Sequence, residues 1–338
     1  MKLLVVLTFF KNIEFLKNCI NSIKKQTFKD FKVIIVDDGP ELDVKVAIRS
    51  LIDNDPRFIY HKNLFNIGAA HSFEEQILKY GSEYIMMLHH DDYINEDFMS
   101  KLISGLDFNP ACSFGYSLCY RNNNGIEGND FPTSIRPELK TGVYDLSLHT
   151  AINCWTVFSS IIIRRTCYEK IGGFNFYYSR FIKRKISHYR SGESDLYTIA
   201  RLASIGLVYV VNERLCAYRN HDESNSNNLN LKATHIQDNL RTYDYIFDEF
   251  ENFSDEVRLV SKINSIARLA LGHDVFAEVT ERLLYKSPLG LEFIDIRDRF
   301  VFNFAEVLST FILDSSEKNF PKLVSVAEIE AIKKLSFR

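Results

Sequence analysis

Hydrophobic residues in the first 110 positions form short, uniformly apolar runs that alternate with segments of helical periodicity. The apolar runs predict buried strands at residues 3–10, 31–39, 57–61 and 83–90. Between the first two, Ile13, Leu16, Ile20 and Ile23 recur at spacings of three and four, which is typical of an amphipathic helix over 13–25. Helices are also expected at about 41–53, 69–80 and 95–106. This alternation predicts βαβ units and a mostly parallel, Rossmann-like sheet covered on both faces.

The pattern becomes less regular after residue 110 and changes again near residue 230. The middle region is expected to contain an Asn/Gly-rich loop (121–130), an apolar run (155–163), a basic loop (179–190), a helix (193–205) and a strand (207–211). Residues after 229 show only helical patterns. We therefore expect an α/β domain over 1–229, with halves 1–110 and 111–229, and an α-helical C-terminal domain over 230–338.

Composition and charge narrow the class of protein. The 338 residues are 46% hydrophobic and carry a net charge of −3, which gives no reason to expect a nucleic-acid binder. The six cysteines form no CxxC pair, which argues against structural zinc and a disulfide framework and favours a reducing cytoplasm. No apolar run reaches the roughly 18 residues that a membrane span needs, so any membrane contact is expected to be peripheral. The opening "MKLLVVLTFF" is interpreted as a first strand rather than a signal peptide.

Polar residues gather where three predicted strands end. Thr8 to Phe10 close the first strand, Asp37 and Asp38 the second, and "HHDD" (89–92) the fourth. In open parallel sheets ligands bind at the carboxyl ends of the strands. We therefore expect these side chains to converge on one crevice.

The "HHDD" stretch favours a hard cation over zinc. Successive strand side chains point to opposite faces, so His89 and His90 are not expected to bind one ion, whereas Asp91 and Asp92 in the following turn can. Carboxylates suit Mg²⁺ or Mn²⁺, which bind substrate phosphates. A purely structural turn remains the alternative. Asp38 is likewise either a ligand contact or a turn residue before Gly39.

Three features of the middle region are candidates for chemistry or for plain structural roles. Asp195 opens a helix and is either a general base or an N-terminal cap. His221 follows a predicted strand and is either a ligand or part of a solvated loop. The basic loop 179–190, which includes Arg184 and Arg190, is either solvated surface or a receptor for an anionic acceptor.

Six segments, in order, resemble the GT-A-fold family 2 glycosyltransferases. They cover about residues 3–226 and are "VVLTFFKNIEFLKNCINSIKKQTFKDFKVIIVDDG", "NLFNIGAAHS", "MLHHDDYINEDF", "SSIIIRRTCYEKIGGF", "ESDLYTIARLASIG" and "YRNHDES". The resemblance implies a bacterial, inverting transferase that uses a nucleotide sugar. It departs from the family's metal motif at His89, where an Asp is usual, which puts metal affinity and preference in question.

The resemblance also implies roles for single residues. Thr8 and Phe10 would line the pocket for the nucleobase of the donor, Asp38 would pair with the edge of uracil, and Asp91 would approach the ribose. Asp92 and His221 would bind Mn²⁺ or Mg²⁺, with Asp195 as general base six residues before Arg201. Arg184, Arg190 and His89 would contact the diphosphate or the acceptor.

The expected function is transfer of a sugar from a nucleoside-diphosphate sugar, UDP-linked by preference, to a hydroxyl of a surface-glycan acceptor such as lipopolysaccharide or capsule. The alternatives are an inactive GT-A-like scaffold and a sugar nucleotidyltransferase, although no early glycine-rich phosphate loop is present. A GxGxxG fingerprint is also absent, which argues against a dinucleotide-dependent oxidoreductase. We expect a cytoplasmic protein, peripheral on the inner membrane face if it meets a lipid-linked acceptor, and a homodimer through the C-terminal helices.

Overall fold

The computed structural model describes residues 1–39, 44–123, 126–130, 139–147, 150, 157–174 and 193–221. The chain divides into two compact units, Met1–Ser261 and Lys262–Arg338, and all described residues belong to the first. The boundary predicted near residue 230 and the predicted C-terminal helices lie outside the described residues. So do Arg184 and Arg190 of the basic loop.

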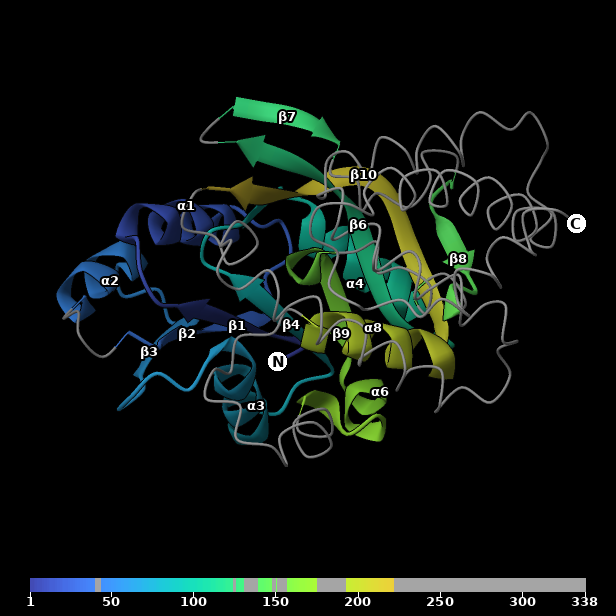
Figure 1. The fold of residues 1–338 in the computed structure, drawn as a ribbon, viewed down its shortest axis with the longest axis horizontal. Helices are drawn as coiled ribbons and strands as arrows, with labels where there is room; N and C mark the ends of the chain where they lie inside the picture. Colours follow the sequence, from blue (N-terminus) through green and yellow to red (C-terminus); the bar gives the residue numbers. More distant parts are fainter. Residues whose placement is uncertain are drawn as a thin grey trace, which may run out of the picture. The chain divides into compact units, whose positions relative to one another are not determined.

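The first half of the described unit follows the predicted alternation of strands and helices (Figure 1). Its elements are β1 (Leu3–Phe9), α1 (Ile13–Lys24), β2 (Phe31–Asp37), α2 (Lys45–Ile52), β3 (Phe58–Lys62), α3 (Ala69–Lys79) and β4 (Tyr84–His89). Asn12 caps α1, because its side chain accepts a hydrogen bond from the backbone N–H of Phe15. These bounds confirm the predicted elements to within a few residues.

The second half completes the sheet and adds helices to it. Its elements are β5 (Tyr93–Ile94), α4 (Phe98–Phe108), β6 (Cys112–Asn123), β7 (Ile126–Asp130), β8 (Gly142–Tyr144), η1 (Phe158–Ser160), β9 (Ile161–Arg164), α6 (Arg165–Lys170), α8 (Glu193–Ile205) and β10 (Leu207–Asn220). The helix predicted over 193–205 is confirmed.

The central sheet has the order β3-β2-β1-β4-β9-β6-β10-β5, with β7 beside β6 and β8 beside β10. Strands β3, β2, β1 and β4 are parallel, and so are β6 and β10. Strand β9 lies between these two parallel groups and is antiparallel to both of its neighbours. The predicted parallel sheet is thus correct for the first half of the unit.

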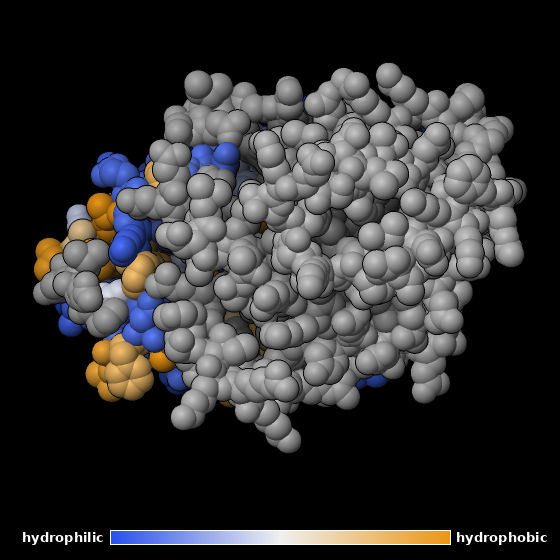
Figure 2. Space-filling view, viewed as in Figure 1, coloured by the Kyte–Doolittle hydropathy of each residue, from blue (hydrophilic) through white to orange (hydrophobic). Residues whose placement is uncertain are grey.

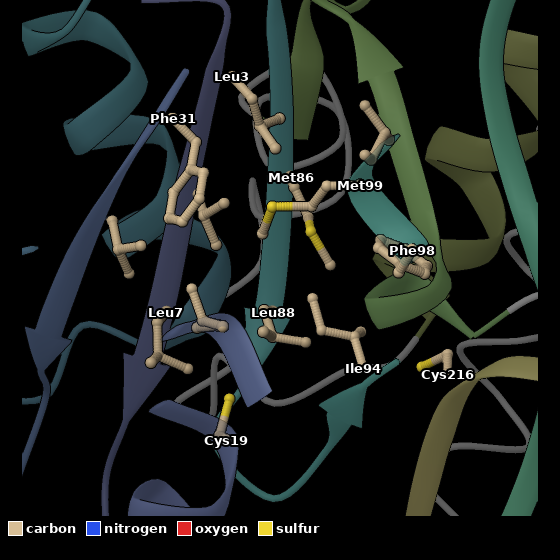
Figure 3. Packing of buried hydrophobic residues seen from close by; sticks show 14 of the residues in the cluster. Leu3, Leu7, Cys19, Phe31, Met86, Leu88, Ile94, Phe98, Met99 and Cys216 are labelled. Atoms are coloured by element: carbon tan, nitrogen blue, oxygen red, sulfur yellow. The ribbon is translucent and has the colours of Figure 1, made fainter. Parts of the chain in front are cut away.

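Two hydrophobic clusters cover the two faces of the sheet. Alternate residues of β1 enter opposite clusters: Leu3 and Leu7 pack with α1 and α4 residues, whereas Leu4 and Val6 pack with residues of α3 and α8. Figure 3 shows the first cluster around Met86. Since each fully buried aliphatic side chain contributes about 1.5–3 kcal/mol, this double covering explains why the strands are apolar throughout rather than alternating.

Two predictions for the middle region were wrong. Residues 121–130 were expected to be a loop, but β6 continues to Asn123 and β7 pairs back on it, so most of this stretch is a β-hairpin. The second difference is β10, which extends past the predicted end at residue 211 to Asn220. A bulge between Val211 and Arg214 absorbs the polar residues that interrupted the apolar pattern.

The surface of the described residues includes a few exposed apolar side chains. Figure 2 shows apolar surface at the margin where Figure 1 draws α2 and β3. Exposed large hydrophobic residues include Val46 on α2 and Leu64 and Phe65 after β3. Single exposed apolar side chains are common on soluble proteins. Across the part of the chain that is described, no helix has both the length and the hydrophobicity needed to cross a bilayer.

Candidate active site

The carboxyl ends of β1, β2 and β4 meet at one edge of the sheet. Phe9 is aligned with Asp37 of β2, and Thr8 with His89 of β4. The segments that follow these strands therefore start side by side, as predicted from their polar composition. Thr8 is buried and Phe10 is partly exposed, next to Lys11, whose Nζ lies 5.2 Å from the Phe10 ring centroid.

Asp38 anchors the turn that leads into α3. Its Oδ1 accepts hydrogen bonds from Asn63 Nδ2 (2.7 Å) and the Ile67 N–H (2.9 Å), and its Oδ2 accepts from the Gly68 N–H (2.8 Å). Gly68 has φ 84°, a conformation that favours glycine. The carboxylate is thus oriented at the sheet edge by backbone donors, and each oxygen has more than one lone pair.

Asp91 and His221 form a pair across 130 positions of sequence. His221 Nε2 lies 3.3 Å from Asp91 Oδ2, and the two side chains are 13% and 22% exposed. The imidazole also packs on Phe15 of α1, with ring centroids 5.0 Å apart. Burial by itself would raise the pKa of Asp91, but the hydrogen bond from His221 and the nearby His90 and His89 outweigh it and hold the pKa well below its usual range.

Asp92 lies beneath this pair and is only 3% exposed. Its Oδ1 accepts a hydrogen bond from the backbone N–H of Arg219 (3.0 Å), and Ser159 also hydrogen-bonds the carboxylate. Burial, and secondly the charge of Asp91, raise the pKa of Asp92 to about 7. Asp91 is therefore the more exposed of the two carboxylates, and Asp92 fastens the β4 turn to β10.

Arg219 is a site residue that the sequence did not single out. Its Nε donates to the Asp91 carbonyl oxygen (2.9 Å), and its guanidinium lies 4.4 Å from the Phe15 ring centroid and 5.7 Å from that of Tyr93. Only 7% of this residue is exposed. The neighbouring "YRNH" motif was the one available signal, and it pointed to His221 rather than to the buried cation before it.

His89 is the last residue of β4 and His90 follows it in the turn, and the two histidines face different neighbours. The His89 N–H donates to Ser159 Oγ (3.2 Å), and its carbonyl oxygen accepts from the Asp92 N–H (3.1 Å). The His90 ring meets Phe9 edge-on at 5.3 Å. Burial lowers the pKa of His90 from its ordinary value. Their roles at the donor or acceptor remain predictions.

Asp195 lies in the first turn of α8 and is partly exposed. The apolar face of the helix, which includes Leu196, Ile199 and Leu202, is buried and so places Asp195 relative to the core. Arg201, six residues later, donates through Nη1 to the carbonyl oxygen of Ile171.

The residues at the sheet edge fit a hard divalent cation. Asp91 supplies a carboxylate, which suits Mn²⁺ and Mg²⁺, and His221 supplies an imidazole 3.3 Å from it. Within the described ranges no group of three His, Cys, Asp or Glu side chains is arranged to hold a metal. Such a cation commonly takes only one or two protein ligands and completes its coordination with water and substrate phosphates.

The mixed sheet with its parallel group β3-β2-β1-β4, covered by helices on both faces and with polar side chains at the carboxyl ends of these strands, is typical of α/β proteins that bind ligands at that edge. Comparison with known proteins makes this more specific. A family model described as "Glycosyl transferase family 2" matches residues 4–167.

Named relatives agree with the family model. A GalNAc(5)-diNAcBac-PP-undecaprenol beta-1,3-glucosyltransferase of Campylobacter jejuni is 27% identical over 124 residues, 36% of this chain and 40% of that protein. An uncharacterized glycosyltransferase of Methanocaldococcus jannaschii is 30% identical over 117 residues, 34% of this chain and 40% of its own length. The matches thus span less than half of these relatives.

Solved structures share the fold. S. aureus TarS, crystallised with UDP-GlcNAc, gives a TM-score of 0.57 at 15% identity, covering 100% of this chain and 91% of that one. A mannosyltransferase of Pyrobaculum calidifontis, solved with GDP-Man and Mn²⁺, gives 0.52 at 12% identity, covering 99% and 86%. Residues 4–167 therefore resemble glycosyl transferase family 2, and the chain shares the GT-A fold of the solved structures. The family model and the relatives' names point to a glycosyltransferase.

Proposed function

We propose that this protein is an inverting glycosyltransferase that moves a sugar from a UDP-sugar to a hydroxyl of a surface-glycan acceptor. The observation that supports it best is the Asp91–His221 pair at the carboxyl edge of the sheet, backed by Arg219. The TarS complex with UDP-GlcNAc supports a UDP-sugar donor. The name of the C. jejuni relative, which includes an undecaprenol-linked saccharide, supports a lipid-linked acceptor.

In this proposal the donor lies across the strand ends. Thr8 and Phe10 contact the nucleobase, Asp38 accepts a hydrogen bond from the edge of uracil, and Asp91 lies towards the ribose and diphosphate. Because Asp38 is already oriented by the Ile67 and Gly68 N–H groups, it meets the base without reorganising.

A bound Mn²⁺ or Mg²⁺ would supply positive charge that stabilises the departing nucleoside diphosphate. We propose Asp91 and His221 as its protein ligands. Asp92, expected from the sequence to be a ligand, is assigned instead to orienting Asp91, because its carboxylate is buried against Arg219 and Ser159. Arg219 fixes the Asp91 backbone from below, so the carboxylate needs little rearrangement.

The acceptor hydroxyl is activated by Asp195 in this mechanism. Its carboxylate takes the hydroxyl proton as the oxygen attacks the anomeric carbon, while the bond from that carbon to the diphosphate oxygen breaks on the opposite face. One such displacement inverts the anomeric centre and needs no covalent intermediate. Arg184, Arg190 and His89 are proposed to contact the diphosphate or an anionic acceptor.

The remaining proposals concern the whole protein. We place the catalytic domain at 1–229 and a helical domain at 230–338, which would form a homodimer or meet a membrane-borne acceptor from the cytoplasmic side. A truncation after residue 229 that stays monomeric, soluble and fully active, beside a full-length protein that is also monomeric and binds no lipid vesicles, would contradict this role.

The proposed activity is tested by UDP release from UDP-GlcNAc and UDP-glucose, with Mn²⁺ and with EDTA. We expect release with Mn²⁺ and its loss with EDTA. The substitution of His89 for the usual Asp favours one rival, an inactive scaffold. A protein that binds UDP with Mn²⁺ but releases none from any UDP-sugar, with or without saccharide acceptors, would support that rival.

A further inference from the structure

Glu74 is a buried carboxylate on α3, among the core residues Phe73 and Ile77 and apart from the donor site. Its Oε1 accepts hydrogen bonds from Tyr168 Oη (2.6 Å) and from the backbone N–H of Phe174 (2.6 Å). Burying a carboxylate is costly unless its hydrogen bonds are made. An apolar side chain at position 74 would pack against the core without the cost of burying a carboxylate. We therefore ask what the hydrogen bonds of Glu74 hold in place.

The contacts fix the backbone of residues 171–174. Gly173 has φ 55°, and a Cβ there would lie 2.5 Å from Glu74 Oε1 and 2.6 Å from the Tyr168 ring. The chain therefore approaches Glu74 as closely as glycine allows. This segment is "IGGF", which follows α6.

The same segment holds α8 from its other side. Arg201 donates to the Ile171 carbonyl oxygen, and its guanidinium lies 5.5 Å from the centroid of the Tyr197 ring on the same helix. Asp195 lies six residues before Arg201, about 9 Å along a helix axis. At the other end of α3, the N-cap residue Gly68 donates its N–H to Asp38 Oδ2 (2.8 Å).

We propose that Glu74 is a positioning residue that sets the place of the base helix relative to the donor site. The connection runs from Asp38 through α3 to Glu74, then through residues 171–174 and Arg201 to α8. This inference rests on the proposed function, since Asp195 is the residue to be positioned. It predicts that removing the hydrogen bonds of Glu74 slows the reaction step and leaves nucleotide binding unchanged.

The experiment compares Glu74→Ala and Gly173→Ala with a control on the same pair of helices. Arg165→Met is the matched control, because Arg165 joins α6 to the end of α3 through the carbonyl oxygens of Tyr80 and Ile77 (both 2.6 Å) without reaching α8. Glu74→Gln is the conservative variant, since its amide oxygen can still accept from both donors. Three properties are measured: UDP affinity with Mn²⁺, the rate of UDP release from UDP-GlcNAc, and amide hydrogen exchange over residues 193–205.

For Glu74→Ala and Gly173→Ala we expect faster exchange over 193–205 and a loss of rate approaching about 10²-fold, the cost of small misplacements. UDP affinity should stay within about threefold, because only the reaction step is affected. Glu74→Gln should restore most of the rate, and Arg165→Met should lower stability but leave rate and exchange over 193–205 unchanged.

Unchanged exchange over 193–205 in both disruptive variants, or an equal rise in Arg165→Met, would overturn the inference. If the unsubstituted protein releases no UDP from any UDP-sugar, with or without saccharide acceptors, the proposed function fails, and the exchange comparison still decides whether Glu74 holds α8.

Discussion

Asp91 and Asp92 are adjacent in sequence and differ in environment. Asp91 pairs with His221 and its pKa is held low, whereas Asp92 is buried and its pKa is raised to about 7. Two neighbouring carboxylates with pKa values moved apart can serve different roles. The exposed one is suited to bind a cation, and the buried one to link β4 and β10.

The raised pKa of Asp92 predicts a pH effect on stability. The carboxyl titrates near pH 4 when unfolded and near pH 7 when folded. Between these values the native state holds a proton that the unfolded state has lost, so this group's contribution falls as pH rises, by up to about 1.4 kcal/mol per pH unit. The stability of the original protein relative to Asp92→Asn, measured by urea unfolding in EDTA, should therefore fall from pH 5 to 7.

Comparison with Asp92→Asn is needed because three histidines change the stability of the fold with pH in the opposite direction to Asp92. Burial lowers the pKa values of His61, His71 and His90, so below about pH 6.5 the unfolded state binds more protons at these sites and stability rises with pH. The variant keeps all three. Stability curves of the two proteins that run parallel from pH 5 to 7 would contradict the proposed environment of Asp92.

Asp195→Asn tests the proposed base. The amide cannot accept the acceptor proton, yet it has nearly the same size, so UDP affinity with Mn²⁺ should be almost unchanged. Loss of general base catalysis typically costs about 10²–10⁴-fold in rate. Turnover of UDP-GlcNAc and UDP affinity by calorimetry are the two measurements.

Asp53→Asn provides the control for Asp195→Asn. Asp53 is exposed at the end of α2 with φ 48°, a conformation that Asn adopts equally well. The rate of UDP-GlcNAc turnover by the Asp53→Asn variant should match that of the original protein. Equal losses of affinity and rate in Asp195→Asn would exclude the base assignment.

At the scale of elements, α4 approaches β10 closely enough to require glycine. A Cβ on Gly105 would lie 1.8 Å from a ring carbon of Tyr209. Alanine would otherwise favour the helix by about 1 kcal/mol, whereas overpacking costs about 1–3 kcal/mol. We expect Gly105→Ala to lower the free energy of unfolding by about 1 kcal/mol, measured by urea denaturation.

Gly81→Ala is the control, because no atom lies within 4 Å of a Cβ there. It should change stability little. Adding Tyr209→Ala to Gly105→Ala should remove the penalty of the clash, which a double-mutant cycle measures. An additive cycle would show that the α4–β10 approach is looser than described.

The prediction for the whole molecule concerns ligand-linked stability. A ligand that binds only the native state stabilises it by about 2.7 kcal/mol at 100 times its dissociation constant. UDP with Mn²⁺ should therefore raise the melting temperature more than UDP with EDTA. Asp91→Ala should lose the Mn²⁺-dependent part, and a rise caused by NAD instead of UDP would contradict the assigned class.

The sequence determined the first half of the molecule well. Strands β1 to β4 were predicted because burial on both faces demands uninterrupted apolar runs, and α1 because its apolar residues recur on one face. The prediction failed at 121–130, where Asn and Gly suggested a loop but pairing of β7 with β6 made a hairpin. It also stopped β10 too early, because a bulge interrupts the pattern.

For the site, the sequence by itself determined which residue types stand at the strand ends, because chain direction and strand period place them there. Only the tertiary structure decided which of them meet. His221 reaches Asp91, Arg219 is buried behind it, and Glu74 meets the Phe174 N–H 100 positions away. Such contacts leave no local signature, since they depend on how the sheet is ordered and how its helices pack, and not on the spacing of residues along the chain.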